Sequence, residues 1–179
     1  IGAGAVIAER AVIAEGVVRQ IRHRLWGARV DVSEHARERA TAALTALRVV
    51  NLMASDDDDA VLTLFVALTS LNLAEEGAVS SELTSTYGMA EVGSRSLGLR
   101  RVADVYARLL DRAVADAGPS GVAEAKVFRG MRLIGDGDLE TASRLLAEAS
   151  AACDTWGSPY IAEVVESSAG YADCYANDL

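Results

Sequence analysis

The chain has 179 residues, of which 51% are hydrophobic, 5% are aromatic and two are prolines. This apolar content argues against a disordered chain, and the abundance of alanine, leucine and valine favours helices. The net charge of −9 argues against nucleic acid as a partner, because phosphate binding requires clustered cations.

A helical period runs along nearly the whole chain and predicts eight helices and no strand. The first helix ends near Trp26-Gly27, and Ser33 is the expected N-cap of the second, which runs through Met53. The acids Asp56 to Asp59 are expected to begin the third helix, where backbone N–H groups favour negative charge. The third helix is expected to end at Gly77, and the fourth to run from Ser80 or Ser81 to about Arg95. Gly98 separates the fourth helix from the fifth, which Gly118-Pro119 closes. The sixth is expected from about Gly121 to Ile134, broken by Gly135-Asp136-Gly137, the seventh ends at Trp156-Gly157, and the eighth follows Pro159.

The sequence repeats with a fixed period from one predicted helix pair to the next. Gly98 and Gly137 are separated by a step of 39 residues (from 98 to 137), and Ala103 and Ala142 repeat that step. Six residues of the later unit fall at the offsets of the tetratricopeptide repeat (TPR) signature: Gly130, Leu133, Gly137, Ala142, Leu146 and Ala149. The small residue at Gly130 is expected to let one helix press on the next, where Ala142 lies opposite.

The sequence therefore predicts an all-α fold of tandem antiparallel helix pairs, a TPR-like α-solenoid with a right-handed superhelix. We expect one domain over residues 1–179, with an N-terminal helical pair at 1–54 and repeat units at 55–96, 97–136 and 137–179. The last helix is expected to be either a cap or a truncated repeat. Because the chain begins at Ile1, we also expect a fragment of a longer protein.

Several segments carry a resemblance to a family of larger proteins. Residues 67–75 (ALTSLNLAE) precede a tyrosine-bearing helix at 81–87, the turn at 97–100 (LGLR) follows, and a basic helix at 19–25 lies upstream. This arrangement resembles the carboxy-terminal TPR-like region of bacterial ATPases fused to adenylate or guanylate cyclase, or to protein kinase, modules. The resemblance implies a regulatory part of a cytoplasmic signalling protein. The ATPase and cyclase activities are not expected in this chain, because it has no GxxxxGK[ST] phosphate-binding loop.

The polar clusters match no catalytic or metal-binding pattern. The acids at 56–59 lack the DDxxD pattern of metal–diphosphate enzymes, since residue 60 is alanine, and they lack the glycine of an EF-hand loop. His23 and His35 have no Cys or Asp at metal-ligand spacing, and both are expected to be exposed to solvent. No GxSxG nucleophile elbow is present. We therefore expect no catalytic residue, no metal and no cofactor, and a chain that is not an enzyme.

Four arginines surround Trp26, at positions 19, 22, 24 and 29. We expect them to form a solvated face or a surface that docks on a neighbouring domain, rather than a membrane or nucleic-acid site. The first 25 residues are too charged for a signal sequence and too short for a membrane span. Cys153 and Cys174 are expected to be free, packed thiols, and the five tyrosines are expected to pack in the core.

The expected partner is a protein or peptide, or another domain of the same polypeptide, bound in a concave groove lined by first-helix residues. That groove projects Arg95, Glu124 and Met131 as partner-binding residues. The alternative is a small-molecule sensor with an apolar groove lined by Met131, Val92 and Ile134. The exposed apolar end of a repeat stack also predicts a homodimer, through residues 160–179 or the first helix.

Overall fold

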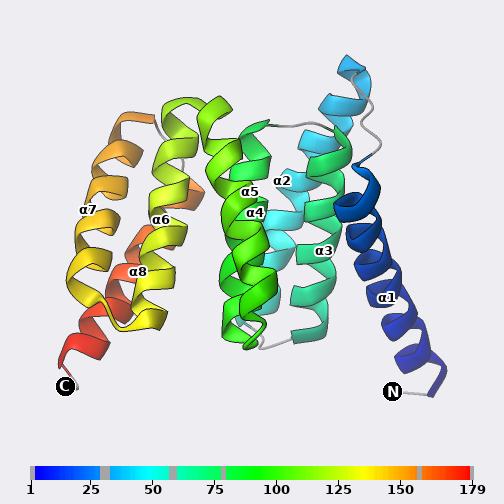
Figure 1. Cartoon of the computed structure of the whole chain (residues 1–179), viewed down its shortest axis with the longest axis horizontal. Helices are drawn as coiled ribbons and strands as arrows, with labels where there is room; N and C mark the ends of the chain where they lie inside the picture. Colours follow the sequence, from blue (N-terminus) through cyan, green and yellow to red (C-terminus); the bar gives the residue numbers. More distant parts are fainter. Residues whose placement is uncertain (1–2, 29–32, 57–59, 78–79, 157–158, 178–179) are drawn as a thin grey trace. The chain divides into compact units, whose positions relative to one another are not determined.

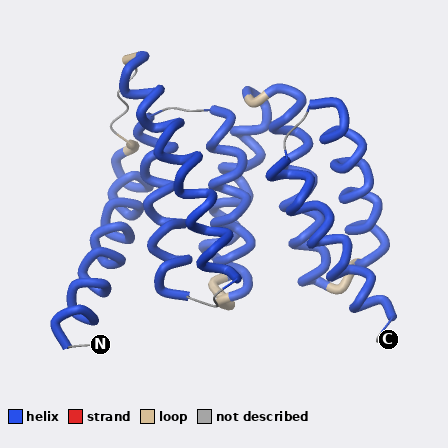
Figure 2. Tube along the Cα trace, turned by 180° about the vertical axis from the view of Figure 1, so that it is seen from behind, coloured by secondary structure: helices blue, strands red, loops and turns tan. Residues whose placement is uncertain are grey.

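The computed structural model describes residues 3–28, 33–56, 60–77, 80–156 and 159–177. Every regular element in these ranges is an α-helix, so the all-α prediction is confirmed (Figure 2). The helices, labelled in Figure 1, are α1 (Ala3–Trp26), α2 (Glu34–Asp56), α3 (Ala60–Gly77), α4 (Ser80–Ser96), α5 (Arg100–Asp116), α6 (Gly118–Asp136), α7 (Leu139–Trp156) and α8 (Pro159–Asn177).

Local sequence signals determine several of the helix ends. The Ser33 Oγ accepts a hydrogen bond from the Ala36 amide (3.3 Å), which confirms Ser33 as the N-cap of α2. Gly137 follows the end of α6 with a φ of +82°, a left-handed conformation that carries no Cβ penalty in glycine. Its N–H donates to the Ile134 carbonyl (3.1 Å), so a carbonyl of the last turn of α6 has a partner.

Two predicted boundaries are wrong. Helix α2 continues through Asp56, so this acid closes α2 instead of opening α3, which starts at Ala60. The reason is that no glycine or proline occurs in residues 34–56 to stop the helix earlier. The rest of the acidic tetrad lies outside the described residues. Helix α6 begins at Gly118 rather than Gly121, because proline fits the first turn of a helix, where its missing N–H is not needed.

The chain divides into two compact units, Ile1–Thr86 and Tyr87–Leu179, and the division falls inside α4. In the first unit α3 packs against both α1 and α2 (Figure 1). Leu44 of α2 and Val66 of α3 belong to the buried apolar core of this unit. The contact of α1 with α3 has a different character, because the side chains buried there are polar.

In the second unit α6 packs against α5, α7 and α8. The apolar core that joins the last three helices is a cluster of four buried residues, Val127, Leu146, Ala149 and Val165. Phe128 of α6 is fully buried and lies against Gly88 of α4. The rings of Tyr87 and Tyr106 are buried with centroids 6.3 Å apart, which confirms core positions for these two tyrosines.

Gly130 lies at a close approach of α6 and α7. A Cβ at this position would lie 2.9 Å from Leu146 Cγ and 3.5 Å from the Ala142 carbonyl oxygen. The first distance is shorter than packed carbon atoms tolerate. The predicted contact of Gly130 with the helix that carries Ala142 is therefore confirmed.

Candidate functional site

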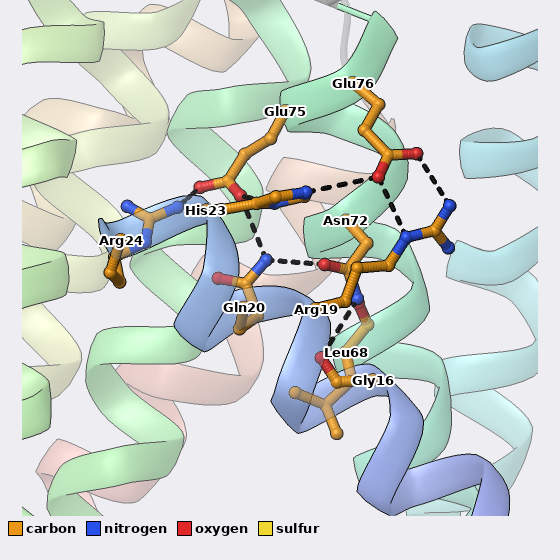
Figure 3. A network of polar contacts seen from close by, with 9 residues as sticks. All are labelled: Gly16, Arg19, Gln20, His23, Arg24, Leu68, Asn72, Glu75 and Glu76. Atoms are coloured by element: carbon orange, nitrogen blue, oxygen red, sulfur yellow. Dashed lines mark hydrogen bonds and ion pairs between the residues drawn. The ribbon is translucent and has the colours of Figure 1, made fainter. Parts of the chain in front are cut away.

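A buried polar network joins α1 to α3 within the first unit (Figure 3). The Gln20 amide nitrogen donates hydrogen bonds to Asn72 Oδ1 (2.8 Å) and to Glu75 Oε2 (2.9 Å). The His23 Nδ1 lies 2.6 Å from the same Glu75 oxygen. These four residues are at most 6% exposed, so α1 turns a polar face toward the interior of the unit. Buried polar groups are tolerated when they find hydrogen-bond partners, as the side chains of Gln20 and Asn72 and the Nδ1 of His23 do.

Two arginines lie at the edge of the network and neutralise its carboxylates. Arg19 forms a two-pronged ion pair with Glu76, with Nε 2.9 Å from Oε1 and Nη2 3.0 Å from Oε2. Arg24 pairs through Nη2 with the Oε1 of Glu75. Each buried or half-buried carboxylate of the network therefore faces a guanidinium, which offsets the cost of removing it from water.

The network follows from the spacing of residues on both helices. Gly16 precedes the two buried polar residues of α1 at positions 20 and 23, and on α3 Leu68 precedes positions 72 and 75. Both sets have the i, i+4, i+7 spacing that forms one stripe on a helix. The absent side chain of Gly16 lets the helices approach, because a Cβ there would lie 3.2 Å from Leu68 Cβ. Asn72 Nδ2 donates to the Leu68 carbonyl (2.8 Å) and reaches the Gly16 carbonyl (3.4 Å).

The predicted solvent exposure of His23 is wrong, whereas His35 is exposed as expected. His23 is buried because it lies on the stripe of α1 that faces α3. Burial lowers the pKa of His23, the carboxylate of Glu76 acts in the opposite direction, and the guanidinium groups of Arg24 and Arg19 lower it further. Burial therefore opposes protonation of the ring, while the nearby carboxylate of Glu76 favours it.

The imidazole of His23 is placed to connect helices and not to act as a general base. Its Nδ1 is taken by Glu75, its Nε2 lies 3.2 Å from the Oε1 of Glu76, and its side chain is 1% exposed. A general base needs a ring nitrogen within hydrogen-bond reach of a substrate proton. No group of three or more His, Cys, Asp and Glu residues in the described ranges is arranged to hold a metal ion.

Sequence reasoning missed Gln20, Asn72 and Glu75 as members of one site, although it singled out the two segments that contain them. The segments 19–25 and 67–75, on which the family resemblance depends, are the two that pair in this network. One pattern in the sequence indicates the site. Polar residues at 20 and 23 of α1, and at 72 and 75 of α3, have the helical spacing that normally belongs to a buried apolar stripe.

A second polar cluster connects α4 with α5 and α6 in the second unit. Glu91 is fully buried, and its Oε1 lies 3.4 Å from Nη1 of Arg132. The Nη1 of Arg95 lies 3.4 Å from Asp136, and its Nη2 lies 3.8 Å from Asp104. These contacts place ion pairs along the side of α4 that faces α6.

The three predicted partner-binding residues lie on two helices, Arg95 on α4 and the other two on α6. Arg95 meets α6 at Asp136, whereas Glu124 and Met131 lie two turns apart on another face of α6. Glu124 and Arg95 are half-buried, and Met131 packs against the apolar cluster of α6, α7 and α8. Ile134, assigned to the alternative ligand groove, packs against the same cluster. The side chains of Arg29, Cys153, Cys174, Tyr160, Tyr171 and Tyr175 lie outside the described residues.

The burial of Glu91 predicts a pH dependence of stability in the second unit. Burial raises the pKa of Glu91 above its usual 4.5, and Arg132 opposes that rise. The folded unit thus holds this proton more tightly than the unfolded chain, so the stabilising contribution is full below pH 4.5 and is lost as pH rises through the raised pKa. We expect Glu91→Gln to flatten this part of the profile, measured by urea unfolding between about pH 4 and pH 8.

Glu148 provides the control for this measurement. Lys126 lowers the pKa of this exposed carboxyl, so its contribution has the opposite sign and is lost as pH falls below 4.5. Glu148→Gln should leave the loss of stability above pH 4.5 unchanged. An unaltered pH profile in Glu91→Gln would contradict the burial of an ionisable group at this position.

The chain matches no protein-family model and no curated protein, and no solved structure matches it. None of the described helices is both long enough and apolar enough to cross a lipid bilayer. The geometry of the two polar clusters and the distribution of exposed side chains are therefore the observations on which a function can be argued.

Proposed function

We propose that this chain is a non-catalytic protein-interaction scaffold, whose docking surface is the apolar outer face of α1. The observation that supports the proposal is the placement of exposed apolar side chains. Of the thirteen large hydrophobic residues that are exposed among the described side chains, six lie on α1. Val18, Ile21 and Leu25 are 63%, 53% and 65% exposed. Contiguous apolar patches of this kind mark interaction surfaces in soluble domains.

Helix α1 has the reverse of the usual surface pattern. A surface helix normally buries its apolar stripe and exposes its polar one. In α1 the buried face carries Gln20 and His23, while the opposite face carries Val18 and Leu25. The network with α3 fixes which face points outward, because turning α1 over would leave Asn72 and Glu75 of α3 without those partners. The polar network thus holds the apolar face in a position to receive a partner.

The packing of the last helices supports the TPR-like part of the proposal. Helix α6 packs against both the helix that follows it and the next one, with Gly130 at the close approach to α7. Stacked helix pairs of TPR-like proteins repeat this contact from unit to unit. In this proposal α1 presents the surface that binds.

We further propose that the scaffold is the regulatory arm of a larger bacterial signalling protein, an ATPase or a cyclase. The resemblance carried by residues 19–25 and 67–75 supports this assignment. Recovery of the coding sequence around this chain tests it directly. An upstream ATPase, cyclase or kinase module is the expected result, and a gene that codes for this chain alone would contradict it.

The docking surface is tested with peptides. A fluorescein-labelled amphipathic helical peptide built from leucine, glutamate and lysine heptads should bind the chain, detected by fluorescence anisotropy. Val18→Ser and Ile21→Ser should each weaken binding by about tenfold, because a buried aliphatic side chain contributes about 1.5 kcal/mol or more.

Val49 of α2 is the matched control, since it is 57% exposed in the same unit but lies on a different helix. Val49→Ser should bind the peptide as the natural chain does. Equal affinity in all three serine variants would refute the docking surface. A small molecule that raises the melting temperature while peptides do not would favour the ligand-sensor alternative.

A further inference from the structure

We infer that the helix docking on α1 is the α1 of a second copy of this chain, in antiparallel orientation; this inference rests on the proposed docking surface. The outer face of α1 has the spacing of a coiled-coil seam. Its apolar positions alternate by three and four residues: Ala11, Ala14, Val18, Ile21 and Leu25. All five are exposed within the described chain. A heptad spacing of this kind fits a seam that meets another helix lengthwise.

The sizes of the seam residues favour the antiparallel orientation. Small residues occupy the first half of the seam and large ones the second half. In an antiparallel pair Leu25 faces the alanine at position 14 of the other copy, and Val18 faces the isoleucine at position 21. Large side chains then meet small or medium ones along the whole seam, which keeps the two helices evenly spaced. A parallel pair would place Leu25 against Leu25 and Ala11 against Ala11, and the helix separation would be uneven.

The charges beside the seam favour the same orientation. Glu15 and Arg22 are both exposed, and neither makes an ion pair with another described residue. In the antiparallel pair Glu15 of one copy lies beside Arg22 of the other, and the two-fold axis repeats this contact. In a parallel pair the same two residues of different copies are offset by about 10 Å along the helix axis, which is about two turns. Two complementary ion pairs therefore exist in one orientation and not in the other.

The opposite face of α1 is already occupied. It packs on α3 through Gln20 and His23, so a second copy can approach only from the seam side without breaking the network. A seam of this length buries less area than a standard protein interface. We therefore expect a weak dimer, with a dissociation constant on the order of 10 μM.

Charge exchange tests the pairing and its orientation together. Glu15→Arg and Arg22→Glu should each weaken dimerisation by about tenfold, measured by sedimentation equilibrium, because both ion pairs become repulsive. An equimolar mixture of these two variants should dimerise as well as the natural chain. In the mixed pair a new arginine faces a new glutamate, while the native Arg22 and Glu15 of the two chains still meet. The double variant Glu15→Arg/Arg22→Glu should also recover the natural affinity.

Circular dichroism should show the same helix content in all variants, since both residues are exposed. A chain that stays monomeric up to about millimolar concentration would overturn the inference. Two results would overturn the antiparallel pairing: a dimer dissociation constant that Glu15→Arg and Arg22→Glu leave unchanged, or an equimolar mixture of the two variants that dimerises no better than each variant alone. A monomeric chain that still binds the heptad peptide through Val18 and Ile21 would refute this inference alone. A chain that binds neither the peptide nor itself would refute the proposed docking surface as well.

Discussion

Replacing Gly88 by alanine is expected to lower the free energy of unfolding of the second unit by about 3 kcal/mol or more. Helices α4 and α6 approach so closely here that a Cβ would overlap the Phe128 ring, with Cγ, Cδ2 and Cε2 all closer than 3.0 Å. The ring has no exposed surface, so it has no solvent-facing space into which it could move. The better helix propensity of alanine offsets only about 1 kcal/mol. Urea unfolding followed by circular dichroism measures the loss.

Gly93 is a matched control on the same helix. It is exposed, and a Cβ there would meet no atom within 4 Å. Gly93→Ala should therefore raise the free energy of unfolding by up to about 1 kcal/mol. Phe128→Leu should cost less in the Gly88→Ala background than in the natural chain, because the smaller side chain leaves room for the added methyl group. Similar stabilities for the two alanine variants would contradict the close approach of α4 and α6.

The helix contact at Gly130 can be predicted from the sequence, whereas the helix contact at Gly88 cannot. Gly130 falls at a fixed offset of the TPR signature, so its contact with the following helix could be predicted. Gly88 lies outside that signature, and the residue 39 positions before Gly130 is Glu91, which is not small. Its partner Phe128 lies 40 residues away (from 88 to 128) on a helix that is not adjacent in the chain. Local periodicity finds helices, but it does not reveal which faces of distant helices meet.

The helices could be predicted because each one depends on local signals: apolar period, N-cap residues and glycines at the ends. The network of α1 and α3 could not, because it depends on pairing between residues about 50 apart in the chain. The same chemistry explains why His23 was expected at the surface. A histidine among arginines indicates a solvated face when the helix is considered alone. The carboxylates of α3 stabilise the buried imidazole of His23, and they cannot be inferred from the sequence of α1.

Candidate binding residues were predicted from a groove geometry that depends on the placement of successive pairs. In the structure Arg95 pairs with Asp136 and Asp104 of its own unit. The first helix is one of the two dimer surfaces expected from the sequence, but the sequence alone does not identify Val18, Ile21 and Leu25 as its outer face. In the structure the buried face of α1 is polar. The apolar residues of α1 therefore lie on its outer face and not in the interior of the unit.

Replacing Glu75 by alanine is expected to lower the free energy of unfolding of the first unit by about 3 kcal/mol. Its carboxylate accepts from Gln20 at 2.9 Å, lies 2.6 Å from His23 Nδ1 and pairs with Arg24. Its removal deprives two buried donors and one guanidinium of this acceptor at once, and each buried donor costs about 1–3 kcal/mol when it remains unsatisfied. Urea unfolding at pH 7 measures the loss.

The neighbouring Glu76 separates this network effect from a general effect of losing a carboxylate on α3. Glu76 also lies 3.2 Å from the Nε2 of His23, but its side chain is 23% exposed and its partner Arg19 is 44% exposed, so Glu76→Ala should cost less than Glu75→Ala, about 1 kcal/mol. Because the network also fixes the outward face of α1, Glu75→Ala should weaken dimerisation, whereas Glu76→Ala should leave it nearly unchanged. Equal losses of stability in the two variants would mean that α1 is held by its exposed ion pairs. Dimerisation that survives Glu75→Ala would show that the seam of α1 pairs without the support of α3.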